Sequence, residues 1–175
     1  MTTLKALFIE ELSVRYDSKK QLVKAMPKMA NCSTSNSLKQ FLQSHLRQTE
    51  HHVRDLECVF KAFSETPLAK KCLGTLGILK EGENIASTLV GSSAINSALI
   101  SSSQKMENYE IASFECLNNW AKDLKNDEAA GILQNILVQE EMANRSLEVL
   151  ARSMSNYEAL GMNTEEAVYG SVANG

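Results

Sequence analysis

The chain has 175 residues, of which 43% are hydrophobic and 22% charged, and its formal net charge is −3. This length and composition suit one globular domain with a single core and exclude a disordered chain. Acidic and basic residues are interspersed and no apolar stretch is long enough to span a bilayer, so we expect neither nucleic acid nor a membrane as a partner. The opening residues lack the basic and apolar blocks of a signal peptide, which leads us to expect a cytoplasmic protein.

The cysteines are too far apart in the sequence to form a CxxC pair, so the spacing signals neither a zinc site nor a redox motif. In a protein without a signal peptide, reduced thiols are the usual state. We therefore expect these residues to be small, buried members of the core rather than catalytic thiols. They are Cys32, Cys58, Cys72 and Cys116.

Apolar residues recur at three- and four-residue steps along the chain, which predicts amphipathic helices. There are only two prolines, and the first of them, Pro27, should bend or weaken the end of the first helix. Asp127 follows a short polar turn and is the predicted N-cap of the last helix. In chain order, we predict long helices at residues 4–30, 37–63, 93–124 and 128–154, with one or two short crossover helices at 68–91.

Short loops within each pair of long helices predict two antiparallel pairs, and the crossover lets these pairs close into an antiparallel four-helix bundle. The predicted fold class is therefore all-α, with one bundle domain at residues 1–154. Beyond residue 155 the periodic pattern fades and glycines appear. Residues 155–175 are predicted to form a flexible C-terminal tail.

Polar residues interrupt the apolar stripes at similar heights on three of the long helices. These residues are His45, Gln48, His52, Glu107, Glu110, Glu140 and Asn144. Inward carboxylates and imidazoles at one level of a bundle hold two iron or manganese ions in ferritin-like proteins. The same pattern is equally compatible with a metal-free layer in which Lys19 pairs with the acids. Because Glu107 and Glu110 are about 60° apart on the helical wheel, we expect that they do not both point fully inward.

Several stretches of the sequence resemble the YciE/YciF family of bacterial stress proteins. They are Leu7–Leu12 (LFIEEL), Gln21–Ala30 (QLVKAMPKMA), Lys70–Cys72 (KKC), Ala98–Ile100 (ALI) and Gln104–Ala112 (QKMENYEIA). The last of these is the most specific, and the resemblance covers residues 4–152. It implies a ferritin-like fold, a tendency to dimerise and a di-metal centre built from inner acids, in a family with no firmly assigned reaction.

The chain departs from the family pattern where the inner acids are expected. Where the family has Ala-Glu-Lys-Gln-Leu, this chain has Lys19 at the position of the glutamate. Where the family has His-Leu-Glu-Glu-Thr, residues 45–49 of this chain read His-Leu-Arg-Gln-Thr. Met-Glu-Gly becomes Thr-Leu-Gly at residues 75–77, and the Asp of Glu-x-x-x-Asp becomes Asn144. These changes predict a reduced or lost di-metal centre that binds no metal or a single iron or manganese ion.

The candidate metal ligands that remain are His45, His52, Glu107, Glu110 and Glu140. A single ion could be held by His52, Glu110 and Glu140. In a metal-free layer, the ammonium of Lys19 should lie within hydrogen-bonding range of Glu107, Glu110 or Glu140.

The leading interpretation is a ferritin-like, stress-associated protein that is non-catalytic or weakly metal-binding. One alternative is an active di-iron or di-manganese carboxylate protein that handles peroxide or oxygen; another is a metal-free helical scaffold that binds a protein partner. Whether the chain is an enzyme stays open at this point.

The first helix and the crossover carry more apolar residues than one bundle face would bury, which predicts a homodimer. The crossover residues concerned are Leu73, Leu76, Ile78 and Leu79.

Overall fold

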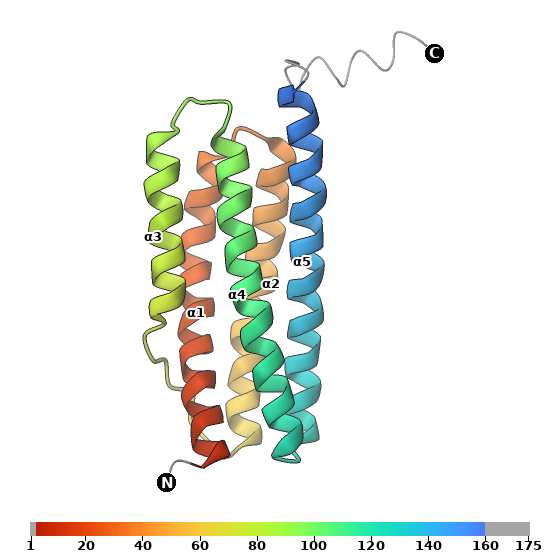
Figure 1. Ribbon diagram of the computed structural model, residues 1–175. Coiled ribbons are helices and arrows are strands. Elements are labelled where there is room, and N and C mark those ends of the chain that lie inside the picture. The colour runs from red at the N-terminus through yellow and green to blue at the C-terminus, as the bar shows by residue number, and fades with distance from the viewer. Residues whose placement is uncertain (1–2, 160–175) are drawn as a thin grey trace, which may run out of the picture.

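A computed structural model describes residues 3–159, with side chains described as far as residue 153. This part of the chain forms five helices and no strand (Figure 1). The helices are α1 (Leu4–Cys32), α2 (Asn36–Ala62), α3 (Leu73–Thr88), α4 (Ile95–Asp123) and α5 (Asp127–Ala159).

The four long helices confirm the prediction from the sequence, with small differences at their ends. The first helix continues past Pro27 to Cys32, and the crossover forms a single helix, α3. The last helix extends to Ala159, beyond its predicted end at residue 154. Residues 160–175 of the predicted tail lie outside the described residues.

Side-chain caps mark the first turns of α1 and α5. The hydroxyl of Thr3 accepts a hydrogen bond from the backbone N–H of Ala6 at 3.2 Å and starts α1. At α5, the side-chain oxygen of Asn126 accepts from the backbone N–H of Ala129 at 3.0 Å. The prediction that Asp127 caps this helix is therefore wrong: Asp127 is the first helical residue, where its negative charge still suits the positive end of the helix dipole.

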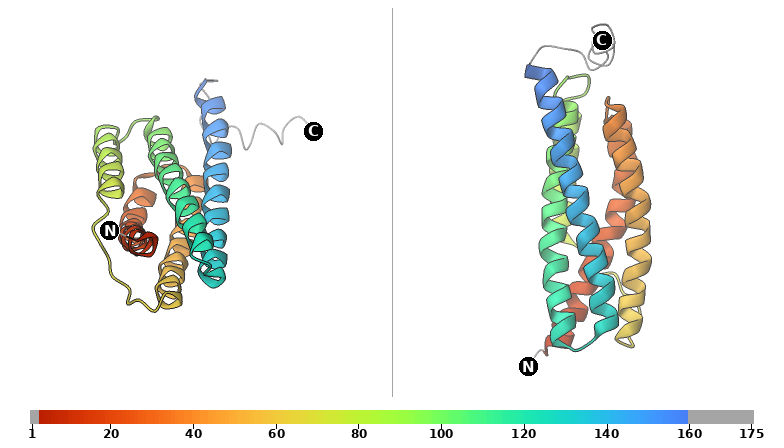
Figure 2. Two further views of the ribbon diagram at one scale, coloured as in Figure 1. Left: turned by 60° about the horizontal axis from the view of Figure 1, so that its bottom comes forward. Right: turned by 90° about the vertical axis from the view of Figure 1, so that its right-hand side faces the viewer.

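The long helices form an antiparallel four-helix bundle of the ferritin-like type, as the sequence predicted. The hairpins α1–α2 and α4–α5 lie side by side, so that α2 packs on α5 and α1 packs on α4. The crossover helix α3 lies outside this ring, against α1 and α4 (Figure 2). In this arrangement, one side of each long helix faces the axis of the bundle along its middle turns.

The core divides into two parts along the bundle axis. One part, which we call the packed end, contains the start of α1 and the turn between α4 and α5. Its buried residues include Phe8, Leu12, Leu56, Phe60, Phe63, Phe114, Leu117, Leu133 and Ile136. The opposite part, the open end, contains the end of α1 and the start of α4, and its buried residues include Leu22, Met26, Leu38, Leu42, Leu99, Ile100, Met106 and Leu147.

The four cysteines are free, but only Cys72 is buried. Cys32, Cys58 and Cys116 are exposed, so the prediction that the cysteines belong to the core is wrong for three of them. Cysteine is small enough to fit either face of a helix, and its residue type alone does not tell which face it occupies.

The apolar residues of the crossover are split between the core and the surface. Leu73 and Leu76 are 69% and 42% exposed, whereas Ile78 and Leu79 are partly buried against the open end.

Within the described residues, no helix combines the length and the apolar character needed to cross a membrane.

Candidate functional site

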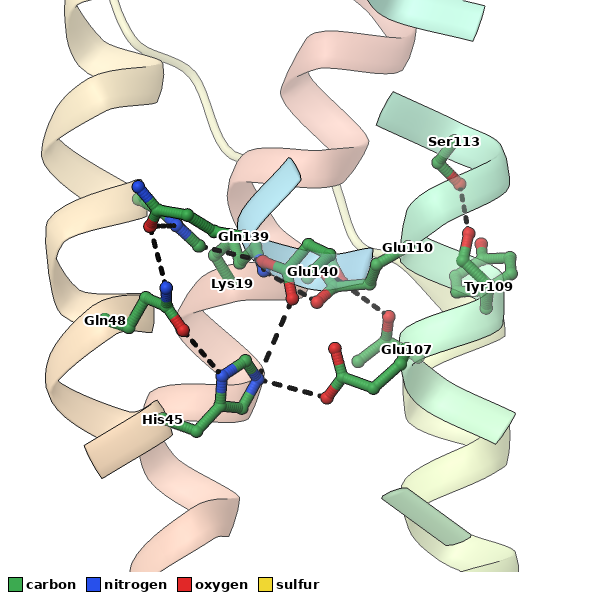
Figure 3. A network of polar contacts seen from close by, with 12 residues as sticks. Lys19, His45, Gln48, Glu107, Tyr109, Glu110, Ser113, Gln139 and Glu140 are labelled. Carbon is green, nitrogen blue, oxygen red and sulfur yellow. Dashed lines mark hydrogen bonds and ion pairs between the residues drawn. The ribbon is translucent and has the colours of Figure 1, made fainter. Parts of the chain in front are cut away.

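A buried polar layer lies at mid-height of the bundle, between the packed end and the open end. It consists of Lys19 from α1, His45 and His52 from α2, Glu107 and Glu110 from α4, and Glu140 from α5 (Figure 3). All six side chains are buried, and those of Lys19, Glu110 and Glu140 are 0% exposed. Charged groups this deep are costly unless each has a partner.

Lys19 is the central cation of the layer. Its ammonium donates to Glu110 Oε2 at 2.7 Å and also contacts Glu140 Oε1. The ring of Phe114 lies below it, with its centroid 5.3 Å from Nζ. The ammonium thus joins carboxylates from two different helices, which confirms the predicted contact of Lys19 with the acids.

His45 and Glu107 face each other on the open-end side of the layer. His45 Nε2 lies 3.0 Å from Glu107 Oε1 and 3.7 Å from Glu140 Oε2, while His45 Nδ1 lies 3.2 Å from Gln48 Oε1 (Figure 3). His52 Nδ1 lies 2.8 Å from Glu140 Oε1. Both predicted histidines therefore reach the acids, with Glu140 contacted from two sides.

Glu107 and Glu110 are both buried, at 3% and 0% exposure, so the prediction that they cannot both point inward is wrong. The helical-wheel argument assumed a narrow buried face. However, α4 packs against α5, α1 and α3, and this wide contact encloses both positions. The oxygens of Glu110 are used by Lys19 and by the hydroxyl of Ser18, which donates at 3.2 Å.

Opposing effects set the pKa values in the layer. Burial alone would lower the pKa of Lys19, but the carboxylates of Glu110 and Glu140 outweigh burial and raise it. Burial would also lower the pKa of His45, yet Glu107 and Glu140 raise it to about 9. Burial would raise the pKa of Glu140, but the positive charge of Lys19, the largest opposing effect, holds this pKa well below its usual range. Both shifts favour the charged forms, so Lys19 and Glu140 form an ion pair at neutral pH.

Glu107 differs from Glu140 because no lysine touches it. Burial raises the pKa of Glu107 to about 8, although His45 acts in the opposite direction. At neutral pH Glu107 is therefore largely protonated, and its carboxyl group hydrogen-bonds to that of Glu140. No other residue donates to Oε2 of either acid, so this contact depends on the proton that Glu107 carries.

Three candidate ligands converge on one point of the layer. His45, Glu107 and Glu140 each offer an atom within 4.8 Å of the other two, and all three residues are buried. The set that we expected for a single ion, His52, Glu110 and Glu140, is arranged differently, because Lys19 occupies the space between the two carboxylates.

The sequence analysis missed Gln139, which completes the layer on the α2 side. Its Oε1 accepts from Gln48 Nε2 at 2.8 Å and lies 2.8 Å from His52 Nε2. It precedes Glu140 by one position and is only partly buried, so the three- and four-residue spacing of the inner positions gave no reason to place it with the inner residues.

The sequence analysis also missed a buried cluster beneath α3. The guanidinium of Arg15 is 1% exposed, and its Nη2 donates to Tyr109 Oη at 2.8 Å and to Cys72 Sγ at 3.2 Å. Cys72 is the N-cap of α3 and also contacts Thr75. Burial would raise the pKa of the Cys72 thiol, but the contacts with Thr75, Tyr109 and Arg15 lower it. Two motifs of the sequence pointed to this cluster: Gln104–Ala112, which contains Tyr109, and Lys70–Cys72, which contains Cys72.

The bundle and its inner layer are those of a ferritin-like helical protein, and comparison with known proteins identifies its family. A family model described as "Domain of unknown function (DUF892)" matches residues 3–160, so the chain belongs to this family. The chain is also 30% identical over 160 residues to Protein YciF of Escherichia coli strain K12, a match that covers 91% of this chain and 96% of that protein. The resemblance to the YciE/YciF family is thereby confirmed.

Solved structures agree with this assignment. The crystal structure of the E. coli stress protein YciF matches with a TM-score of 0.86 and 29% identity, covering 89% of this chain and 99% of that one. YcfI from Rhodopseudomonas palustris matches with a TM-score of 0.81 and 32% identity, covering 83% and 93% of the two chains. A Xanthomonas campestris protein, at 22% identity and a TM-score of 0.68, shares the fold.

Proposed function

We propose that this chain is a metal-independent relative of the YciF-type stress proteins, in which an internal ammonium takes the place of a metal centre. The observation that carries the proposal is the position of Lys19, which is 0% exposed and contacts both Glu110 and Glu140. The role in stress comes from the description of the E. coli relative as a stress protein. On this proposal the layer holds the bundle together and catalyses no metal-dependent reaction.

The donor set does not fit a two-metal centre. Such a centre uses about four carboxylates and two histidines to balance the charge of two metal ions. In the described part of the chain, the buried carboxylates are only those of Glu107, Glu110 and Glu140. Two of them already contact Lys19, and the neutral Gln48 and Asn144 stand where the family has acids.

Metal analysis of protein purified without chelators tests this proposal. We expect far less than one equivalent of iron or manganese per chain and no change in thermal stability on adding EDTA. Two equivalents per chain, with stability that falls when EDTA is added, would overturn the proposal in favour of an active di-metal protein.

One observation favours a second candidate, a single weakly held ion. His45, Glu107 and Glu140 converge, and no residue other than these acids themselves reaches Oε2 of either acid with a hydrogen bond. Imidazole and carboxylate ligands suit iron or manganese. Titration with Mn²⁺ should then give one saturable site that is lost in Glu107→Gln, whereas the metal-independent proposal expects no saturable binding to the parent protein.

We further propose that the chain forms a homodimer. The segment before α3 and its first turns expose the apolar side chains of Leu68, Leu73 and Leu76, which are 57%, 69% and 42% exposed. Large apolar side chains that are exposed close together in the chain are the kind that a protein interface would cover. Sedimentation at micromolar concentration should show a dimer that Leu73→Glu dissociates, and a parent protein that sediments as a monomer would contradict this proposal.

A further inference from the structure

A buried thiol lies where the start of α3 meets α1 and α4. Cys72 is the N-cap of α3 and is 0% exposed. Arg15 Nη2 donates to its sulfur at 3.2 Å, the backbone N–H of Thr75 donates at 3.4 Å, and the hydroxyl of Tyr109 lies 3.6 Å away. A cation and N–H donors at the positive end of a helix stabilise the thiolate form of cysteine. Burial would raise the pKa of this thiol, but these contacts lower it.

The guanidinium of Arg15 supplies a second, independent feature, a buried cation with an unused donor. Its side chain is 1% exposed, and its Nε lies 3.0 Å from Oε1 of the partly exposed Glu11. Nη1 is buried and donates to none of the described residues. Because Nη2 of the same group already contacts the sulfur, Nη1 is available to an oxygen atom that binds beside the thiol.

The thiol lies close to the surface although it is buried. Its neighbours Leu73 and Gly74 are exposed, and Tyr109 is partly exposed. The Tyr109 side chain packs directly on Gly74, where even a Cβ atom would come within 2.3 Å of the hydroxyl oxygen. The sulfur is therefore covered on this side by a side chain that is itself in contact with solvent. A molecule of a few atoms can reach the sulfur when this side chain turns aside, whereas a bulky molecule cannot.

We propose that Cys72 is a thiolate that reacts with hydrogen peroxide and that Arg15 assists the reaction. The sulfur attacks one oxygen of the peroxide, so that an S–O bond forms and the O–O bond breaks. The sulfur loses two electrons and becomes a sulfenic acid, while the departing hydroxide takes a proton from the solvent and leaves as water. Arg15 binds the peroxide through Nη1 and stabilises the negative charge that develops on the departing oxygen. The reaction uses no metal and does not depend on the polar layer.

The exposed thiols of the same chain are internal controls for the test. The full-length protein is treated with hydrogen peroxide in the presence of a chelator, and catalase ends the reaction at chosen times. The protein is then unfolded, iodoacetamide marks the thiols that are still reduced, and mass spectrometry measures each cysteine. We expect Cys72 to be oxidised at least about tenfold faster than Cys32, Cys58 and Cys116, because it is the one held as a thiolate. If accessibility controls the rates, the exposed cysteines react first, and this result would overturn the proposal.

Substitutions of Arg15 test its part in the reaction. Arg15→Gln removes the cation, so oxidation of Cys72 should slow by at least about tenfold, and the pH of half-maximal rate should rise as the thiol pKa rises. Arg15→Lys keeps the charge and should restore part of the rate. The control is Arg47→Gln, at an exposed position of α2, which should oxidise like the parent.

The pH profile is read against the groups that face this thiol. They are Arg15, its partner Glu11 and Asp17 on α1, and Tyr109 on α4; Asp17 Oδ2 accepts from the backbone N–H of Cys72 at 2.8 Å. Of these only Arg15 is a cation, so Arg15→Gln is the change that should move the profile to higher pH. An unchanged rate and profile in a folded Arg15→Gln would overturn the proposal. If this variant does not fold, the comparison of the four cysteines in the parent protein decides the matter by itself.

Discussion

The two ends of the bundle differ in how completely their side chains fill the space between the helices. At the packed end, aromatic rings are in direct contact: the centroids of Phe8 and Phe63 are 4.5 Å apart, and those of Tyr16 and Phe60 are 5.8 Å apart. At the open end, leucines and methionines surround a cavity of about 360 Å³. The packed end is therefore the better filled of the two, while the open end keeps an apolar cavity at some cost in packing.

The polar layer between the two ends shows the same difference on a smaller scale. Around Lys19, the carboxylates of Glu110 and Glu140 are paired with an ammonium. Toward the open end, Glu107 contacts His45 and Glu140 but no lysine, and its raised pKa keeps it largely protonated at neutral pH. The ammonium thus explains how two of the buried acids stay charged without metal, whereas the third is accommodated mainly as a neutral acid.

Removing the cation should have the largest effect of any single substitution. Lys19→Met keeps the length of the side chain but leaves Glu110 and Glu140 as buried, unpaired acids. We expect a loss of about 3–5 kcal/mol in the free energy of unfolding, measured by urea denaturation. The control is Lys24→Met, at an exposed position of α1, which should change stability by less than about 0.5 kcal/mol. Equal midpoints for both variants would show that Lys19 does not support the layer.

Matched leucine truncations compare the two ends directly. Leu133 is 0% exposed at the packed end, and Leu42 is 2% exposed beside the cavity. Truncations of this kind lower the free energy of unfolding by ~2–5 kcal/mol. We expect the loss to be near the upper limit for Leu133→Ala and near the lower limit for Leu42→Ala, because truncating Leu42 removes fewer contacts. Urea denaturation of both variants measures the difference. A larger loss for Leu42→Ala would mean that the open end is the better packed of the two.

Filling the cavity should have the smallest effect, and in the opposite direction. In a well-packed core, a small-to-large substitution is destabilising by about 1–3 kcal/mol. Ala86→Leu places its added carbons in open space, so we expect an increase of about 0.5–2 kcal/mol in the free energy of unfolding. Its control, Ala129→Leu at the packed end, is 0% exposed and should be destabilising. Destabilisation by Ala86→Leu to the same degree would show that the cavity has no free volume.

The sequence predicted the parts of this molecule that depend on periodicity and on charge. The helices follow from the apolar spacing, and the pairing of Lys19 with acids follows from an inward lysine facing inward carboxylates. The burial of Arg15 could not be predicted, because arginine is rarely buried and its partners Cys72 and Tyr109 come from distant parts of the chain. The cavity could not be predicted from the sequence either, because it depends on how closely α3 approaches the ring of long helices.

The pairing of Glu107 with His45 illustrates the same limit within the site. The sequence placed both residues on inner faces, but the choice of partners depends on the relative heights of α2, α4 and α5. A shift of about two helical turns, roughly 10.5 Å, would bring His52 rather than His45 to Glu107. The periodicity of the sequence identifies the residues of such a layer, but which of them pair is determined by how the helices pack.

The central claim is that Lys19 supplies the charge that a metal ion would otherwise bring. The most direct test is thermal melting of Lys19→Glu and of the parent protein, each with EDTA and with Mn²⁺. With EDTA, Lys19→Glu should melt well below the parent, because it adds a buried carboxylate to Glu110 and Glu140. With Mn²⁺ at about 100 times its dissociation constant, Lys19→Glu should recover roughly 2.7 kcal/mol while the parent stays unchanged. A parent protein that is itself stabilised by Mn²⁺, or a Lys19→Glu variant that does not respond, would contradict the claim.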